Sequence, residues 1–176
     1  MKLLILPLVA VAVSCSSNHK KTMKEELPSK AVAKMTSSSS PRLSGNVTFL
    51  DEANDIKVTA EIVGLKPNSQ MGFHIHENSI CEAPTYESAG GHLNPHEHKH
   101  GRPGVKSHLG DMGNIKANKA GVAKMELFLP KEDMDDMGRI MNKAVIIHAK
   151  ADDLHSQPTG DAGGRIACGL IRAVAE

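Results

Sequence analysis

Two histidines lie two residues apart in the stretch Gly72–Glu77, which has the sequence GFHIHE. If this stretch is a β-strand, successive side chains point to opposite faces, so His74 and His76 share one face. Imidazole is the commonest metal ligand in proteins, and two rings on one patch of sheet can bind the same ion when further ligands come from elsewhere. Without other histidines at suitable positions, the pair would indicate only a solvated strand face with two polar residues.

Histidine is abundant in the rest of the chain. The sequence has ten histidines and fifteen glycines among 176 residues. Two long segments, residues 78–113 and 152–164, lack a strand pattern, and they contain or border nearly every histidine. Loops of that length inside a compact domain are usually functional. The composition therefore indicates metal chemistry on a loop-rich frame.

The elements that must position these loops are short strands. From residue 31 onward, strand-like runs alternate with turn residues, and no segment shows sustained helical periodicity. Val47–Leu50 and Ile56–Val63 flank a turn-rich segment at 51–55 and predict a hairpin. Residues 131–141 could hold a helical turn because they lack strand alternation. The pattern predicts an antiparallel sandwich or barrel. Further strands are expected at residues 71–77, 122–129 and 144–149.

Charge and aromatic content exclude some kinds of partner. The formal net charge is +1, so no strong overall field attracts nucleic acid or a membrane surface. Aromatic residues make up 2% of the chain and tryptophan is absent, which removes stacking platforms for single-stranded nucleic acid. Any electrostatic function must therefore be local, and we expect no nucleic-acid partner.

The first residues predict export from the cell. Lys2 and an apolar run over residues 3–13 resemble a signal peptide, too short to span a membrane comfortably. Residues 12–15, AVSC, resemble a bacterial lipobox, in which Cys15 would carry the lipid anchor. The alternative is an ordinary cleaved signal with an incidental cysteine. Residues 1–15 are thus the expected signal, 16–30 a flexible tether and 31–176 the folded domain, held at the envelope of a bacterium, in the periplasm.

Two further cysteines, Cys81 and Cys168, lie far apart in the sequence. In an exported protein they are most simply one disulfide, which closes a long loop and restricts the unfolded chain. Thiolate metal ligands are the less favoured alternative because histidine is abundant.

Several motifs together resemble the copper/zinc superoxide dismutase family. The resemblance runs from about residue 31 to the end of the chain. It implies an all-β, Greek-key antiparallel β-barrel or sandwich of about eight strands with two long functional loops. The motifs are, in order, GFHIHE at 72–77, GGHLNP at 90–95, HG at 100–101, HLGDMGN at 108–114, VIIH at 145–148 and AGGRIACG at 162–169.

The resemblance also implies a site for each metal. His92 would be the imidazolate shared by both ions, and its copper-side nitrogen would take up a proton when copper is reduced. Four nitrogens suit Cu(II), and three histidines with one carboxylate suit a structural zinc without an open position. The implied copper ligands are His74, His76, His92 and His148, and the implied zinc ligands are His92, His100, His108 and Asp111.

Other positions match supporting roles in the family. Arg165 matches the arginine beside the copper, where a guanidinium can orient superoxide by charge-assisted hydrogen bonds. Asp152 matches the aspartate that hydrogen-bonds ligands of both metals, although it could also be a loop-capping residue. Cys81 and Cys168 match the family's intrasubunit disulfide.

The chain departs from the family pattern beside the zinc ligands. Arg102 stands in HGRP where a second glycine is usual, and His96 and His98 add two histidines before His100. A shift of register could offer His98 as the zinc ligand instead of His100. His96 and His98 are otherwise exposed loop residues, as His19 and His155 are expected to be, or an auxiliary site that gathers metal.

The sequence thus predicts an enzyme that converts superoxide into dioxygen and hydrogen peroxide with copper and zinc as cofactors. The alternative is a non-enzymatic metal-binding or metal-delivery protein on the same fold. The presence of Arg165 and of every implied copper ligand favours the enzyme, and His108 with Asp111 disfavours a copper-only form. The sequence leaves open whether the protein is a monomer or a homodimer.

Overall fold

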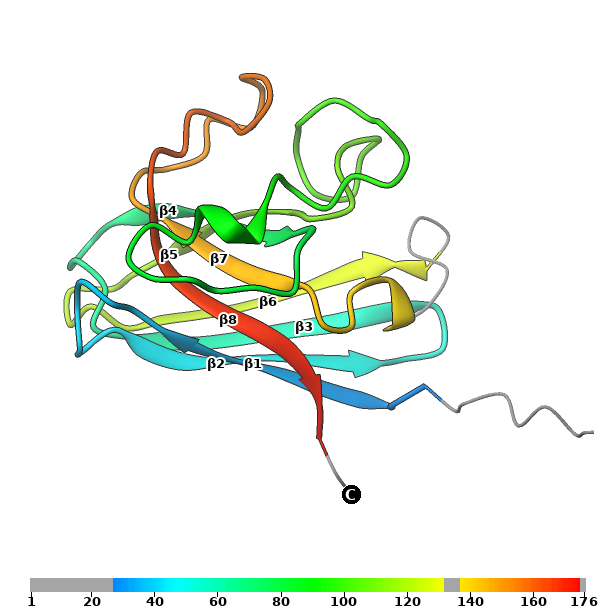
Figure 1. Cartoon of the computed structure of the whole chain (residues 1–176), viewed down its shortest axis with the longest axis horizontal. Helices are drawn as coiled ribbons and strands as arrows, with labels where there is room; N and C mark the ends of the chain where they lie inside the picture. Colours follow the sequence, from blue (N-terminus) through cyan, green and yellow to red (C-terminus); the bar gives the residue numbers. More distant parts are fainter. Residues whose placement is uncertain (1–26, 132–136, 175–176) are drawn as a thin grey trace, which may run out of the picture.

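Eight antiparallel strands form one sheet that nearly closes into a barrel (Figure 1). The computed structural model describes residues 27–131 and 137–174. Along the sheet the strand order is β5-β4-β7-β8-β1-β2-β3-β6. At the two edges, Ala117 after β5 pairs with Ala123 of β6. The strands of the described residues are β1 (Lys30–Thr36), β2 (Ser44–Asp51), β3 (Asp55–Val63), β4 (Gln70–His76), β5 (Asp111–Lys116), β6 (Ala123–Pro130), β7 (Ala144–His148) and β8 (Arg165–Ala173).

The connectivity is of the Greek-key type. Strands β1, β2 and β3 follow one another in the chain and in the sheet, and β8 returns from the far end of the sequence to pair with β1. The predicted all-β, antiparallel fold is therefore confirmed, as are the hairpin and the strands expected near 71–77, 122–129 and 144–149.

Alternating apolar side chains build the core. In β2, Val47 and Phe49 are fully buried, whereas Thr48 between them is partly exposed. The facing strand β3 buries Val58 and Ile62 in the same core. Because side chains alternate along a strand, this register places one face of the hairpin inside the barrel and leaves the other face toward solvent.

Strand β4 differs because both of its faces are buried. Phe73 and Ile75 lie in the barrel core with no exposed surface. His74 and His76 are also buried, on the opposite face. Two loops cover that face, which explains how a strand can bury histidines without placing them in the apolar core.

The two loops are residues 77–110 and 149–164, and both lie over the same side of the barrel (Figure 1). The first contains a short 3-10 helix, η1 (Glu87–Ala89). It is shorter than expected, because β5 begins at Asp111 whereas the predicted loop continued to residue 113. Gly110 fastens its end to β4: a Cβ there would lie 2.1 Å from the carbonyl oxygen of Ile75. Only glycine allows this approach.

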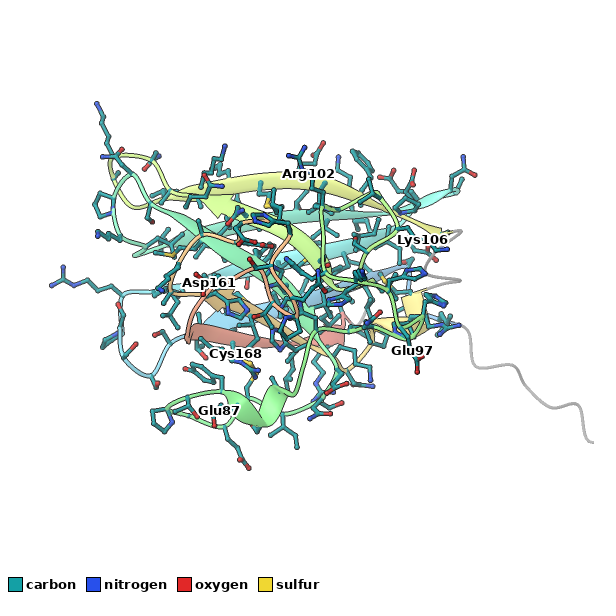
Figure 2. The ribbon with its side chains drawn as sticks, turned by 90° about the horizontal axis from the view of Figure 1, so that it is seen from above. Glu87, Glu97, Arg102, Lys106, Asp161 and Cys168 are labelled. Atoms are coloured by element: carbon teal, nitrogen blue, oxygen red, sulfur yellow. A yellow bond between two sulfur atoms is a disulfide. The ribbon has the colours of Figure 1, made fainter. Side chains whose placement is uncertain are left out.

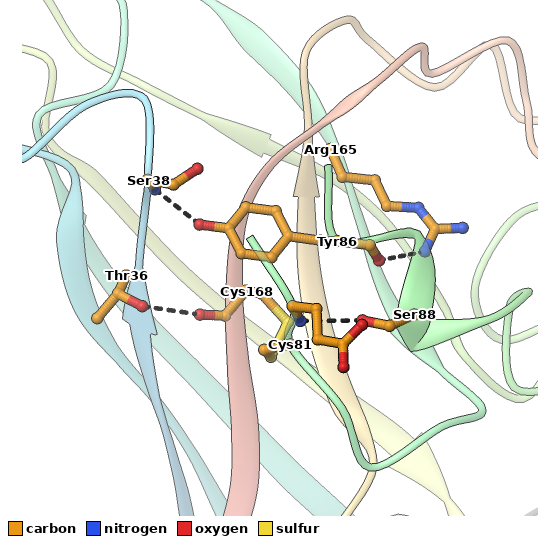
Figure 3. Close-up of a disulfide and its surroundings, with 8 residues drawn as sticks. Thr36, Ser38, Cys81, Tyr86, Ser88, Arg165 and Cys168 are labelled. Atoms are coloured by element: carbon orange, nitrogen blue, oxygen red, sulfur yellow. Dashed lines mark hydrogen bonds between the residues drawn. A yellow bond between two sulfur atoms is a disulfide. The ribbon is translucent and has the colours of Figure 1, made fainter. Parts of the chain in front are cut away.

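A disulfide joins Cys81 in the first loop to Cys168 in β8, as predicted (Figure 3). The same loop segment is also fastened to the turn after β1, where the hydroxyl of Tyr86 accepts a hydrogen bond from the backbone N–H of Ser38 at 2.7 Å. Because Cys81 and Cys168 are bonded to each other, the alternative prediction that they are thiolate metal ligands is wrong.

Other predictions fall at or beyond the described ranges. The expected signal, Cys15 and His19 lie outside the described residues, and β1 begins at Lys30, the last residue of the expected tether. A 3-10 turn, η2 (Met137–Arg139), lies within the segment expected to hold a helical turn. No helix in the described ranges is long and apolar enough to cross a membrane.

Candidate metal centre

Two groups of possible metal ligands lie beside each other under the loops. In each group the ligand atoms all lie within 4.8 Å of one another, and every residue is buried. His92 belongs to both groups. We call them the four-histidine cluster, His74, His76, His92 and His148, and the histidine–aspartate cluster, His92, His100, His108 and Asp111.

Sheet pairing assembles the four-histidine cluster. Strand β4 pairs with β7, which ends at His148, so the rings of β4 meet a histidine that is distant in sequence. The Nε2 atoms of His76 and His148 face each other at 3.3 Å. The loop brings in the fourth ring through an isolated bridge between His92 and His76. Four imidazoles thus converge from two strands and one loop.

Two nitrogens in this cluster have no hydrogen-bond partner among the described residues. They are Nδ1 of His74 and Nε2 of His92, and both atoms are buried. Burying a polar atom without a hydrogen-bond partner costs folding free energy, so such atoms are rare in native proteins. Where they occur, a bound group is one explanation. Nitrogens that face a shared space fit a metal ion, so the residues present suit the copper that the motifs imply.

The four-histidine cluster is built to stay uncharged. Burial, with the neighbouring His92, lowers the pKa of His76 to about 2. Burial, with the neighbouring His74, lowers the pKa of His148 to about 3. Burial also lowers the pKa of His92 to about 4, although a hydrogen bond with Asp111 opposes this change. Neutral rings keep lone pairs available for a metal ion at neutral pH.

In the histidine–aspartate cluster, three rings converge on one carboxylate. Oδ1 of Asp111 lies 2.8 Å from Nδ1 of His92, 3.0 Å from Nδ1 of His100 and 3.3 Å from Nδ1 of His108. Its other oxygen accepts hydrogen bonds from backbone N–H groups of Gly101 and His108. Three nitrogens and one carboxylate oxygen in a closed, buried arrangement suit a structural zinc ion.

The charges in this cluster are complementary. Burial opposes the protonation of His100, but hydrogen bonds with Asp111 and Asp152 outweigh it and raise the pKa of His100 to about 9. Hydrogen bonds from His100, His108 and His92 outweigh the burial of Asp111 and hold its pKa well below the usual range. The carboxylate is therefore ionised and ready to bind a cation.

Asp152 connects the two clusters. Its Oδ2 accepts a hydrogen bond from Nε2 of His74 at 2.9 Å, and its Oδ1 accepts one from Nε2 of His100 at 2.9 Å. Asn114 holds the Asp152 backbone from both sides, with hydrogen bonds of 2.8 Å at the carbonyl and at the N–H. Asp152 thus contacts one implied ligand of each metal, and such contacts orient ligand rings at metal sites.

Arg165 lies at the start of β8, paired with His148 of β7. Its guanidinium donates to the carbonyl oxygens of Tyr86 and Gly90, each at 2.6 Å. Gly90 O also accepts a hydrogen bond from Nδ1 of His76 at 2.9 Å. A surface cavity of about 450 Å³ opens beside Arg165 and Gly163, whose carbonyl accepts a hydrogen bond from His148. A small anion can therefore approach the guanidinium from solvent.

The structure places His100, not His98, in the histidine–aspartate cluster. His98 is half-buried nearby, and within the described residues neither it nor exposed His96 belongs to either cluster. His155 is exposed, as expected, with 78% of its side chain accessible. The residues that sequence reasoning missed act through the backbone: the carbonyls of Tyr86, Gly90 and Gly163 position Arg165, His76 and His148. Backbone acceptors leave no signature in residue type, so no signal could have identified them.

A Greek-key barrel that buries two clusters of possible metal ligands, with His92 in both, is typical of a histidine-rich, metal-binding class of protein. The copper/zinc superoxide dismutase family model matches residues 43–171. A curated superoxide dismutase [Cu-Zn] 2 of Aquifex aeolicus (strain VF5) is 36% identical over 134 residues, which cover 73% of this chain and 78% of that protein. Superoxide dismutase [Cu-Zn] of Yarrowia lipolytica is 39% identical over 155 residues, covering 81% and 96%.

A solved structure titled as the clock protein EA4 superposes with a TM-score of 0.72 at 33% identity, covering 84% of this chain and 96% of its own. The chain therefore belongs to the copper/zinc superoxide dismutase family. It is a superoxide dismutase, with superoxide as its substrate and copper and zinc as its cofactors.

Proposed function

We propose that the four-histidine cluster holds copper, that the histidine–aspartate cluster holds zinc, and that His92 bridges the two ions as an imidazolate. One observation carries this assignment. Within the described residues, Nε2 of His92 is buried without a hydrogen-bond partner in a ring whose centroid is 4.1 Å from that of His74, while Nδ1 of the same ring lies 2.8 Å from the Asp111 carboxylate. The two nitrogens of one ring thus face two different ligand sets.

When bound, copper supplies a one-electron redox couple and zinc supplies a fixed positive charge. The chain's own residues bind the anion and handle the proton. Arg165 carries a guanidinium fixed by two carbonyls beside the solvent-facing cavity, where it orients superoxide by charge-assisted hydrogen bonds. His92 holds or releases a proton at Nε2, the nitrogen on the copper side. Asp152 fixes the rings of His74 and His100.

The test combines metal analysis with a rate measurement on the full chain. Purified active protein should contain copper and zinc in equal amounts. His92→Gln should lower the content of both metals and the rate of superoxide consumption, because the ring that the clusters share is removed. His155→Gln, at an exposed histidine outside both clusters, is the matched control. Unchanged metal contents in His92→Gln would contradict the shared ring.

Family membership disfavours the alternative of a non-enzymatic metal-binding or metal-delivery protein on the same fold. Arg165 favours catalysis, because metal storage needs no guanidinium beside the four-histidine cluster. A purified protein that binds both metals and fails to consume superoxide would favour delivery instead.

We also propose that residues 1–15 export the chain, that Cys15 anchors it to a bacterial membrane through lipid, and that 16–30 tether the domain at 31–176. The disulfide supports export, since such bonds persist in oxidising compartments. A relative named extracellular superoxide dismutase [Cu-Zn], from Drosophila melanogaster, is 33% identical over 97% of this chain. Radiolabelled palmitate should enter the wild-type protein and not Cys15→Ser; absence of label from both would refute the anchor.

A further inference from the structure

His96 and His98 form a second histidine pair, on the loop beside the histidine–aspartate cluster. Their ring centroids are 5.6 Å apart with an angle of 35° between the rings. The ligand pair His100 and His108 has the same centroid separation of 5.6 Å. The two outer rings are therefore spaced as two ligands of one ion are spaced within the cluster. Glu97 lies between the two histidines in the sequence. Seen from above, it is well apart from Glu87, which lies in the η1 segment of the same loop (Figure 2).

Hydrogen bonds orient the ring of His98. Its Nδ1 lies 3.0 Å from the carbonyl oxygen of Ser107, which can only accept, so Nδ1 carries the proton. In the neutral ring Nε2 then keeps its lone pair, as in metal-binding histidines whose other nitrogen donates to a carbonyl. Asn94 fixes the backbone, accepting from His98 N at 3.0 Å and donating to His98 O at 2.9 Å.

This pair and two members of the buried cluster line one small cavity. Its volume is about 30 Å³, and its walls include His96 and His98 as well as His108 and Asp111. Ser107, whose carbonyl oxygen contacts His98, also lines it. Space of this size holds about two water molecules, and therefore a small cation that has shed most of its hydration shell.

We propose that His96 and His98 are an entry site that captures Zn²⁺ at the protein surface and passes it through this cavity to His108 and Asp111. The inference rests on the proposed function in so far as that cluster holds zinc. Zinc accepts imidazole nitrogen, and a stable structural site uses four protein ligands. Two histidines bind the ion more weakly, so it can move on to the four-ligand cluster.

In the first experiment, Zn²⁺ is titrated into protein already loaded with copper and zinc, and calorimetry measures the binding. The wild-type protein should bind one additional ion weakly, and the His155→Gln control should bind it equally. The double variant His96→Gln/His98→Gln should lose this binding while its resident copper and zinc remain. Glutamine can still donate to Ser107 O, which keeps the loop in place. Equal binding by the double variant would overturn the entry site.

The second experiment follows zinc uptake by metal-free protein from a chromophoric chelator that holds Zn²⁺ scarce. The double variant should acquire zinc about tenfold more slowly, because a ligand pair at the cavity mouth raises the local ion concentration. Its final zinc content in excess zinc should equal that of wild type. Equal uptake rates would overturn the proposal. If His108→Gln leaves the resident zinc unaffected, the ligand assignment fails instead, and the two failures are thereby distinguished.

Discussion

The carboxylate of Asp152 accepts a hydrogen bond from Nε2 of His74 at 2.9 Å and, with its other oxygen, fixes a ring of the second cluster. Asp152→Asn leaves one acceptor oxygen and turns an N–H donor toward the other ring. We expect the affinity for both metals to fall by about 10- to 100-fold, as measured by chelator competition. Asp153→Asn, at a neighbouring residue whose carboxylate accepts hydrogen bonds from His155 and Ser156, should leave both affinities unchanged. Loss of only one metal would contradict the bridging role.

Gly160 allows Asp152 and His100 to meet. It has φ +67, and a Cβ on it would lie 1.9 Å from Oδ1 of Asp152 and 2.5 Å from Nε2 of His100. Gly160→Ala should therefore displace this contact and weaken zinc retention during dialysis against a chelator. Gly104→Ala is a close control, because Gly104 has φ +76 but no atom within 4 Å of the added Cβ. Both variants should lose about 1 kcal/mol of stability from the left-handed backbone. Equal zinc retention by the two would show that contact at Gly160 is unimportant.

The guanidinium of Arg165 should matter for rate and not for metal content. Arg165→Ala removes a charge-assisted contact to the substrate anion, and we expect the rate constant for superoxide consumption to fall about tenfold or more. Pulse radiolysis measures this rate, and atomic absorption measures the metals. Arg172→Ala on the same strand is the control. A variant at 165 with full rate and normal copper would contradict the proposed role.

The disulfide joins residues separated by 87 positions. Cross-linking so long a loop restricts the unfolded chain, and removing the bond with Cys81→Ser/Cys168→Ser should lower the free energy of unfolding by about 2–5 kcal/mol. Denaturant unfolding of the metal-free protein measures the change. Reductant should destabilise the wild type by a similar amount and leave the double variant unaffected. An equal response of both to reductant would argue against this account.

The stability of the metal-free protein should be greatest near neutral pH. The pKa values of His76 and His148 fall to about 2 and about 3 in the fold, so below pH 6.5 the unfolded chain binds more protons and stability decreases. The pKa of His100 rises to about 9, so its contribution is complete below pH 6.5 and disappears as the pH passes 9. Urea unfolding measured from about pH 4 to pH 10 should give the largest free energy of unfolding near neutral pH. In His148→Gln the acid limb should be shallower; an unchanged acid limb would contradict the assignment.

Sequence patterns predicted the hairpin of β2 and β3 because one face of each strand is apolar and the other polar. The predicted loop, which ends at residue 113, overlaps the first half of β5, where Asp111 and Gly113 interrupt any apolar alternation although Met112 is buried. Strand β8 was not delimited either. Its Gly169 packs against β1, where a Cβ would lie 2.7 Å from the carbonyl oxygen of Lys34, and this requirement for a small residue removes an apolar signal.

The site was predicted in a different way. The family resemblance implied the eight ligand positions, counting the shared ring in each cluster, and the structure brings all of them together. What could not be predicted was how they are held, because backbone carbonyls such as Gly90 O depend on loop conformation and not on the side chain at that position. The choice between His98 and His100 also needed the fold, since both lie on the same short segment.

The carbonyl oxygen of Gly90 accepts two hydrogen bonds, one from His76 of the four-histidine cluster and one from Arg165. The loop that carries this atom is itself tied to β8 by the Cys81–Cys168 bond. Ring and guanidinium therefore keep a common reference point, and breaking that bond loosens both together. We therefore expect the position of Arg165 relative to the four-histidine cluster to depend on whether the Cys81–Cys168 bond is oxidised or reduced.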